Sequence, residues 1–407
     1  ALRCCSAFNY LLNPTHKIFI NTKPNTKSKW GSLASRYETE KPRKILALDG
    51  GGIRGVLTLE ILLELETQLK TKLNRGDDFR LSDYFDYIGG TSTGAIIAAG
   101  LSIGKSVKEL QTFYEEKGEA MFDKPFLLKR VKYFYNDGPL LRELKNTFGE
   151  GDIDLKSGKF KSLLLTVTMN RSTDSPWPIS NNPFAKYNQP DRADCNLRIP
   201  LYQLVRASTA APAYFRAETL QWDPTNPDKT FVFVDGGVTP YNNPAFLMYR
   251  MATQAPYGLN WKTGEKDLMI VSVGTGSAPS PGTYDNLLET LTKLSNNLMY
   301  AMQVDQDTNC RTIGRCIYGA PLDREIGDLI ARDASGQTIP ASVDTGRPFS
   351  YVRYNADLSD QGLAALGLQH IESEDVRQMD SVKYMPQMRE VGRAAAKAVS
   401  MNHFVNF

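Results

Sequence analysis

Histidine is scarce in this chain, with three among 407 residues. His16 lies in a polar amino-terminal segment, and His403 lies close to the carboxyl terminus. His370 is surrounded by polar, turn-forming residues, which favours a surface or packing role. A reaction that needs a proton acceptor must therefore find it mainly among the carboxylates.

Cysteine is equally rare, and its spacing excludes two classes of protein. The five cysteines are odd in number and include no Cys-x-x-Cys pair, which does not fit a disulfide framework. We expect Cys310 and Cys316 to be reduced. No histidine lies near a cysteine pair at ligand spacing, and neither an EF-hand loop nor His-Glu-x-x-His is present. We therefore expect no metal and no cofactor.

Long apolar runs and strong charge are also missing. No apolar stretch approaches the 18 residues of a membrane span, so no transmembrane segment is predicted. The net charge is only +3, and no block of five to eight Lys or Arg residues occurs, so we expect no nucleic-acid partner. Residues 1–40 show no signal-peptide pattern, which favours a cytoplasmic protein.

Short apolar runs alternate with helical patterns from residue 44 onward. Such alternation predicts an α/β fold with a mostly parallel central sheet flanked by helices. Composition does not change after residue 43, so we expect a single domain over 43–400, with residues 1–42 as an amino-terminal extension or arm. The predicted strands are 45–48, 87–89, 162–169, 231–234 and 268–273, and the predicted helices are 56–73, 95–99, 106–119, 139–148, 285–302 and 387–399.

A Gly-x-Ser-x-Gly motif follows the strand 87–89, in Gly90-Thr91-Ser92-Thr93-Gly94. Alone it is weak evidence, because it recurs in any Gly-rich turn. Between a strand and a helix, however, the spacing is that of a nucleophile elbow, in which a sharp turn exposes a serine hydroxyl above the sheet. We therefore predict that Ser92 is a nucleophile.

A second glycine cluster, Asp49-Gly50-Gly51-Gly52-Ile53-Arg54-Gly55, lies between strand 45–48 and helix 56–73. Its spacing matches a dinucleotide fingerprint, but no acidic residue ends a second strand about twenty positions on. A P-loop would need Lys and Ser or Thr where Val56 and Leu57 stand. The third reading, an oxyanion hole, uses the N–H groups of consecutive glycines at a helix amino terminus. The elbow at Ser92 favours this third reading.

Asp235 is the best candidate for the base that a serine nucleophile needs. It ends the strand 231–234 and precedes Gly236-Gly237, and in a parallel sheet the carboxyl ends of strands line the active-site crevice. Partial burial would raise the pKa of its carboxyl. The same residues could form an ordinary Asp-Gly turn. His370 remains the alternative, because serine, aspartate, histidine is the chain order of α/β-hydrolases.

These motifs, in this order, resemble the patatin-like phospholipase family. Arg206 to Phe215 resembles its Ala- and Ser-rich stretch ending in Pro and Tyr-Phe, and Asp235 to Pro244 resembles its Asp-Gly-Gly to Asn-Asn-Pro segment. The resemblance covers residues 43–276, with core motifs over 45–276. It implies a three-layer patatin-like fold and a Ser–Asp dyad of Ser92 and Asp235. It also implies an oxyanion hole, which would contain Gly50, Gly51, Gly52, Arg54 and, by elbow geometry, Thr93.

The resemblance implies a lipid acyl hydrolase that cleaves fatty-acyl esters of phospholipids or galactolipids through an acyl-serine. Membrane lipids or lipid aggregates would be the partners, with the protein peripheral at membranes. Aromatic and basic residues alternate over 121–135 and could contact an anionic lipid surface, although they could equally belong to a core and its solvated face. A non-catalytic binding or storage protein and a nucleotide-binding oxidoreductase are the alternatives. Some bacterial members of the family are activated by a cyclic nucleotide, and that partner stays open.

Overall fold

The computed structural model describes residues 28–122, 138–212, 215–223, 225–279, 287–323 and 325–407. Its centre is a nine-stranded sheet with the order β5-β6-β3-β2-β1-β7-β9-β8, in which β4 also pairs with β3. The strands are β1 (Arg43–Leu48), β2 (Tyr87–Thr91), β3 (Leu163–Asn170), β4 (Ser175–Ser180), β5 (Glu218–Gln221), β6 (Thr230–Asp235), β7 (Leu268–Val273), β8 (Arg315–Tyr318) and β9 (Ser350–Tyr354).

Most of the sheet is parallel. The pairs β1–β2, β1–β7, β2–β3, β7–β9 and β8–β9 run parallel, whereas β4, β5 and β6 form antiparallel pairs. The central strands β1, β2 and β7 are buried almost throughout, as expected for parallel strands that are covered on both faces. The predicted α/β class with a mostly parallel sheet is confirmed.

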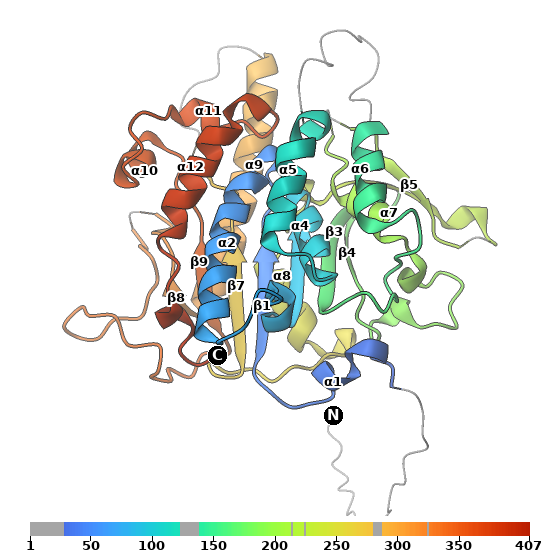
Figure 1. Cartoon of the computed structure of the whole chain (residues 1–407), viewed down its shortest axis with the longest axis horizontal. Coiled ribbons are helices and arrows are strands. Elements are labelled where there is room, and N and C mark those ends of the chain that lie inside the picture. The colour runs from blue at the N-terminus through green and yellow to red at the C-terminus, as the bar shows by residue number, and fades with distance from the viewer. Residues whose placement is uncertain (1–27, 123–137, 213–214, 224, 280–286, 324) are drawn as a thin grey trace, which may run out of the picture.

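Helices cover both faces of the sheet, which gives three layers (Figure 1). Residues of β1 alternate between two apolar cores: Leu46 and Leu48 pack with α2, α4 and α12, whereas Ile45 and Ala47 pack with α8. The helices are α1 (Ala34–Tyr37), α2 (Gly55–Lys72), α3 (Leu81–Tyr84), α4 (Thr93–Ser102), α5 (Val107–Phe122), α6 (Gly138–Phe148), α7 (Leu201–Ser208), α8 (Ala245–Thr253), α9 (Leu287–Ile313), α10 (Asp360–Ala365), α11 (Ser373–Arg377) and α12 (Met385–Ala396).

The strongest sequence signals match the observed elements. The helix predicted over 56–73 is α2, and the capping box that predicted α5 is present, with the Glu109 carboxylate accepting from the Ser106 N–H at 2.8 Å and the Ser106 hydroxyl accepting from the Glu109 N–H at 3.1 Å. The helix predicted over 285–302 continues to Ile313 in α9. The predictions omitted β4, β5, β8 and β9. Two prolines interrupt the strand pattern of β4, and the other three strands are only four or five residues long.

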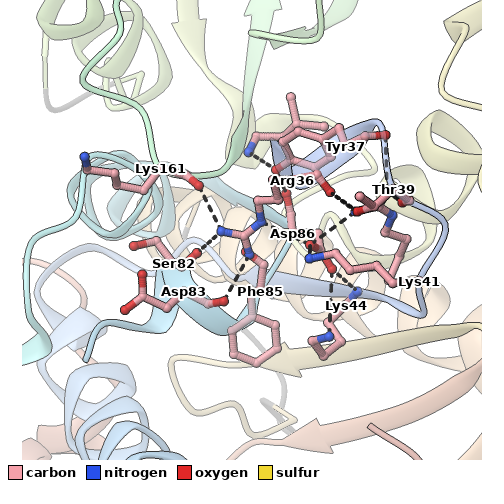
Figure 2. Close-up of polar contacts among 12 residues, drawn as sticks. Arg36, Tyr37, Thr39, Lys41, Lys44, Ser82, Asp83, Phe85, Asp86 and Lys161 are labelled. Atoms are coloured by element: carbon pink, nitrogen blue, oxygen red, sulfur yellow. Dashed lines mark hydrogen bonds and ion pairs between the residues drawn. The ribbon is translucent and has the colours of Figure 1, made fainter. Parts of the chain in front are cut away.

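Residues 28–42, the described part of the predicted amino-terminal extension, pack against the sheet. Arg36 on α1 donates to the buried Asp86 carboxylate at 3.1 Å and to the Phe85 carbonyl at 2.8 Å (Figure 2). Burial would raise the pKa of Asp86, but the charges of Arg36, Lys44 and Lys41 outweigh it and hold this pKa below its usual value. Asp86 directly precedes β2, so this cluster lies at the sheet edge opposite to Ser92, which directly follows β2.

Candidate active site

Ser92 occupies a strained turn between β2 and α4. Its backbone has φ +55° and ψ −122°, outside the regions that a residue with a Cβ usually adopts. The turn is tight enough that a Cβ on Gly90 would lie 2.1 Å from the Gly94 carbonyl oxygen, which explains the need for glycine there. The strand–turn–helix geometry predicted from Gly-x-Ser-x-Gly is therefore present, and α4 begins at Thr93 with its amino terminus beside the serine.

Two hydroxyl groups, one of them within the elbow, join the elbow to distant segments. The Ser208 hydroxyl accepts from the Ser92 N–H at 3.0 Å and donates to the Val167 carbonyl at 2.7 Å. The Thr91 hydroxyl donates to the Tyr241 carbonyl at 2.7 Å. Sequence reasoning had not assigned a role to Ser208, although it lies within the Ala- and Ser-rich stretch that carried the family resemblance.

Asp235 lies directly beside Ser92. The Ser92 hydroxyl donates to Oδ2 of Asp235 at 2.6 Å, and the N–H of Gly237 donates to Oδ1 at 2.6 Å. The prediction that Asp235 ends a strand is confirmed, but the reason based on a parallel sheet is wrong. β6 is antiparallel to β3 and pairs Asp235 with Thr168, whereas Thr91 pairs with the preceding Val167. Although β6 runs in the opposite direction, this register places the Asp235 carboxylate at the same level as Ser92.

The environment of Asp235 makes its carboxyl a stronger base. Only 4% of the residue is exposed, and this burial raises its pKa to about 6. The hydrogen bonds from Ser92 and Gly237 and the charge of Arg206 act in the opposite direction but do not cancel the effect of burial. A carboxylate of this kind is mostly ionised at pH 7 and accepts a proton more readily than an exposed aspartate does.

The glycine turn after β1 lies against the serine. An added Cβ on Gly50 would lie 3.3 Å from Cβ of Ser92 and 2.2 Å from the side-chain oxygen of Asn242. The N–H of Gly50 donates to the Asn242 carbonyl at 3.0 Å, so it is already engaged. The N–H groups of Gly51, Gly52 and Thr93 have no acceptor within the described chain, which leaves these three as the donors available to an oxyanion.

A buried chain of charges supports this turn from the carboxyl-terminal half of the protein. Arg353 on β9 binds both carboxylate oxygens of Asp49, at 2.8 and 2.6 Å, and its Nη1 also donates to the Ser272 hydroxyl at 2.7 Å. Nε of Arg353 lies 4.0 Å from Asp307 on α9, which in turn forms a two-point ion pair with Arg311. The position of the turn therefore depends on α9 and β9.

Arg54 has a different neighbourhood from the one expected. It is 9% exposed, and its Nε donates weakly to the Gly51 carbonyl at 3.5 Å. Its side chain lines a pocket with Tyr300, Gln303 and Arg377. Within the described residues, no hydrogen bond or ion pair joins it to Ser92 or Asp235. Its predicted place in the oxyanion hole remains a prediction.

The remaining candidates lie away from Ser92. His370 has an exposed side chain that pairs with Glu390 at 3.2 Å, and His403 contacts the hydroxyl of Tyr354 at 2.7 Å. Cys310 and Cys316 are free and buried. In the described part of the chain, no cluster of His, Cys, Asp and Glu could hold a metal ion. Most of the proposed lipid-contact segment 121–135 lies outside the described residues.

The patatin-like phospholipase family model matches residues 46–249, half of the chain, and includes the glycine turn, the elbow and Asp235. This chain belongs to the patatin-like phospholipase family. Its resemblance to that family, inferred from the motifs, is thereby confirmed.

Two curated relatives illustrate the range of the family. The chain is 32% identical over 248 residues to a cGAMP-activated phospholipase of Vibrio cholerae, covering 57% of this chain and 64% of the relative. It is 31% identical over 251 residues to Patatin-17 of Solanum cardiophyllum, covering 57% of this chain and 60% of the relative. The chain thus matches less than two thirds of the length of these relatives.

Among solved structures, VipD from Legionella pneumophila matches with a TM-score of 0.36 and 11% identity, over 88% of this chain and 66% of that one. Within the described residues, no helix combines the length and the apolar character needed to cross a membrane. Family membership supports a lipid hydrolase.

Proposed function

We propose that this protein is a lipid acyl hydrolase that cleaves fatty-acyl esters of phospholipids or galactolipids through a Ser92–Asp235 dyad. The observation that carries the proposal is the 2.6 Å hydrogen bond from a serine on a strained elbow to a buried carboxylate. Family membership and the names of the relatives give independent support for lipid ester hydrolysis.

The reaction would begin with attack by Ser92 on the ester. Its Oγ would form a bond to the carbonyl carbon while Oδ2 of Asp235 takes the hydroxyl proton. The bond between this carbon and the alkoxy oxygen would then break, and Asp235 would return the proton to the leaving alcohol or lysolipid. Water would next attack the acyl-serine, giving its proton to Asp235, and expulsion of Ser92 Oγ with that proton would release the fatty acid.

The charge on the tetrahedral intermediate would be stabilised by backbone donors. The N–H groups of Gly51, Gly52 and Thr93 are the donors free for this role, and the amino terminus of α4 adds a favourable dipole. Removing one such donor typically lowers the rate by about 10²–10³. No step in this scheme requires a metal or a cofactor.

Two further parts of the proposal concern partners. We propose that the substrate is presented by membranes or lipid aggregates, to which a cytoplasmic enzyme would bind peripherally. Relatives from Vibrio cholerae and Escherichia coli are named cGAMP-activated phospholipases, so a cyclic nucleotide is a proposed activator. An unchanged rate of lipid hydrolysis at saturating cGAMP would reject activation by that ligand.

The dyad can be tested with Ser92→Ala and Asp235→Asn. Each substitution should lower hydrolysis of a soluble p-nitrophenyl ester and of a phospholipid by about 10⁴-fold or more, as for other catalytic dyads and triads. A fluorophosphonate probe should label the wild type at Ser92 and fail to label Ser92→Ala. Ser102→Ala, at the other end of α4, is the matched control and should keep both activities.

The same experiment separates the alternatives. A binding or storage protein would show no turnover before or after the Ser92 substitution, and an oxidoreductase would not react with the probe. Wild-type activity in Ser92→Ala or Asp235→Asn would refute the dyad.

A further inference from the structure

A pocket next to the catalytic turn is lined by two arginines and by uncharged polar groups. It is open to solvent on one side and lies between the glycine turn, the segment after β7, α9 and the end of α11. Its polar lining consists of Arg54, Ser277, Asn297, Tyr300, Gln303 and Arg377. Among the described residues that line the pocket, none carries a carboxylate.

The pocket and the proposed oxyanion hole share the same turn. Ile53 separates Arg54 from Gly51 and Gly52 in the chain, and the N–H of Ile53 donates to the carbonyl of Met379, another pocket residue, at 2.9 Å. On the β7 side, Thr275 donates to the Gly50 carbonyl at 3.0 Å, two residues before Ser277 of the pocket. A ligand in the pocket would therefore contact the same turn that lies against Ser92.

The charge of Arg54 is only partly compensated, by the nearby carboxylate of Asp49. Within the described chain no carboxylate pairs with it, and its side chain makes only the weak hydrogen bond to Gly51. Burial and, next, the charge of Arg377 lower its pKa to about 10, which still leaves it cationic at neutral pH. A buried cation facing a like charge is costly unless an anion joins them. The pocket therefore has the electrostatic character of an anion site.

We infer that this pocket binds the phosphate of a glycerophospholipid headgroup while the acyl ester lies at Ser92, an inference that rests on the proposed function. Guanidinium groups suit phosphate because they donate several hydrogen bonds and remain charged. Tyr300, Gln303 and Asn297 carry further donor groups. The phosphate lies only a few bonds from the acyl esters of the glycerol, so one molecule can occupy both sites. A galactolipid headgroup is uncharged and cannot form an ion pair with Arg54 or Arg377.

The test compares three substrates on the full chain: phosphatidylglycerol, a galactolipid with the same acyl chains, and p-nitrophenyl butyrate. Arg377→Gln should lower kcat/KM for phosphatidylglycerol about tenfold or more, as expected for the loss of a charged hydrogen bond. Its activity on the other two substrates should stay within about twofold. Arg377→Lys should recover part of the phospholipid activity. Arg393→Gln, an arginine on α12 outside the pocket lining, is the matched control and should change none of them.

The outcomes distinguish this inference from the proposed function. Equal losses on all three substrates would show a structural role for Arg377 and overturn the phosphate site. If inorganic phosphate or cGAMP binds in an Arg377-dependent way and changes butyrate hydrolysis, while phospholipid preference does not depend on Arg377, the pocket serves a soluble phosphate and the headgroup assignment is wrong. If the wild type hydrolyses none of the three substrates, the proposed function fails instead.

Discussion

Asp235 combines two properties at the scale of a single residue. It is buried at the end of β6, and its carboxylate accepts hydrogen bonds from Ser92 and Gly237. Burial raises its pKa to about 6, so the ionised form is retained near neutral pH at a cost in folding free energy. The buried carboxylate is thus a stronger base than an exposed one, and its ionisation lowers the stability of the folded protein.

The pH dependence of hydrolysis follows from this pKa. Only the ionised carboxylate can accept the Ser92 proton, so kcat/KM for a soluble ester should rise with pH, with a midpoint near 6, and level off above about pH 7. The measurement is a rate profile between pH 4.5 and 8.5, with circular dichroism to verify that the protein stays folded. A rate that is flat or falls through pH 6 would contradict Asp235 as the base.

Replacing Asp235 should lower the rate of hydrolysis and increase the free energy of unfolding. In the unfolded chain an aspartate has a pKa of about 3.9, so the folded state binds more protons between pH 4 and 6 and loses stability as pH rises through this window. The cost at pH 8 is about 3 kcal/mol. Asp235→Asn should therefore increase the free energy of unfolding by about 1–3 kcal/mol at pH 8 and by little at pH 4. Urea denaturation at both pH values checks this, and a pH-independent difference would argue against the raised pKa.

At the scale of secondary-structure elements, the site depends on one strand whose direction the local pattern did not reveal and on another strand that was not predicted. β6 runs antiparallel to β3, yet its register brings Asp235 to Ser92. β9 lies outside the residues matched by the family model, yet it supplies Arg353, which binds Asp49 at the start of the glycine turn. The elbow and the turn are positioned by elements far from them in the chain.

The role of Arg353 can be separated from general stability by a matched pair of substitutions. Arg353–Asp49 lies next to the glycine turn, and Arg315–Glu265 is an equally buried ion pair at the opposite edge of the sheet. Both Arg353→Met and Arg315→Met should lower the free energy of unfolding by about 3–5 kcal/mol, because each removes the cation that pairs with a buried carboxylate.

Only Arg353→Met should also lower kcat of the folded protein, by about 10–100-fold with little change in KM, because the turn is proposed to act on the transition state. Assays at low temperature, corrected for the folded fraction, make the comparison. Arg353→Lys keeps the charge and replaces the methionine variant if that one does not fold. Equal specific activity in the Arg353 and Arg315 variants would show that the Asp49 pair is purely structural.

At the scale of the whole molecule, the amino-terminal segment and the proposed chemistry lie at opposite edges of the sheet. The segment 28–42 is fixed to the edge where β2 begins, and Ser92 lies where β2 ends. Arg36 contributes most to this attachment, since its guanidinium also donates to the carbonyls of Ser82 and Lys161. Trp30 stacks on Tyr37, with 4.5 Å between ring centroids.

Arg36→Ala should consequently destabilise the protein without impairing the reaction. Loss of its hydrogen bonds to buried carbonyls and to Asp86 should lower the free energy of unfolding by about 2–4 kcal/mol. The kcat of the folded enzyme should remain within about twofold of the wild type. Arg332→Ala removes an exposed ion pair and should cost less than about 1 kcal/mol. A large fall in kcat for Arg36→Ala in the folded protein would show that the two edges are coupled.

The sequence by itself determined the features that depend on residues close together in the chain. The period of α2, the capping box of α5 and the Gly-x-Ser-x-Gly turn at Ser92 could be read directly, because each is stabilised by contacts within a few positions. Asp235 was found from its strand end and from the family resemblance. Only the tertiary structure decided that β6 is antiparallel and that Ser208 supports the elbow. It also decided that the N–H of Gly50 is already hydrogen-bonded and that Arg54 lines a pocket with Arg377. These facts depend on contacts between segments often more than a hundred residues apart, and no local pattern encodes the register or direction with which such segments meet.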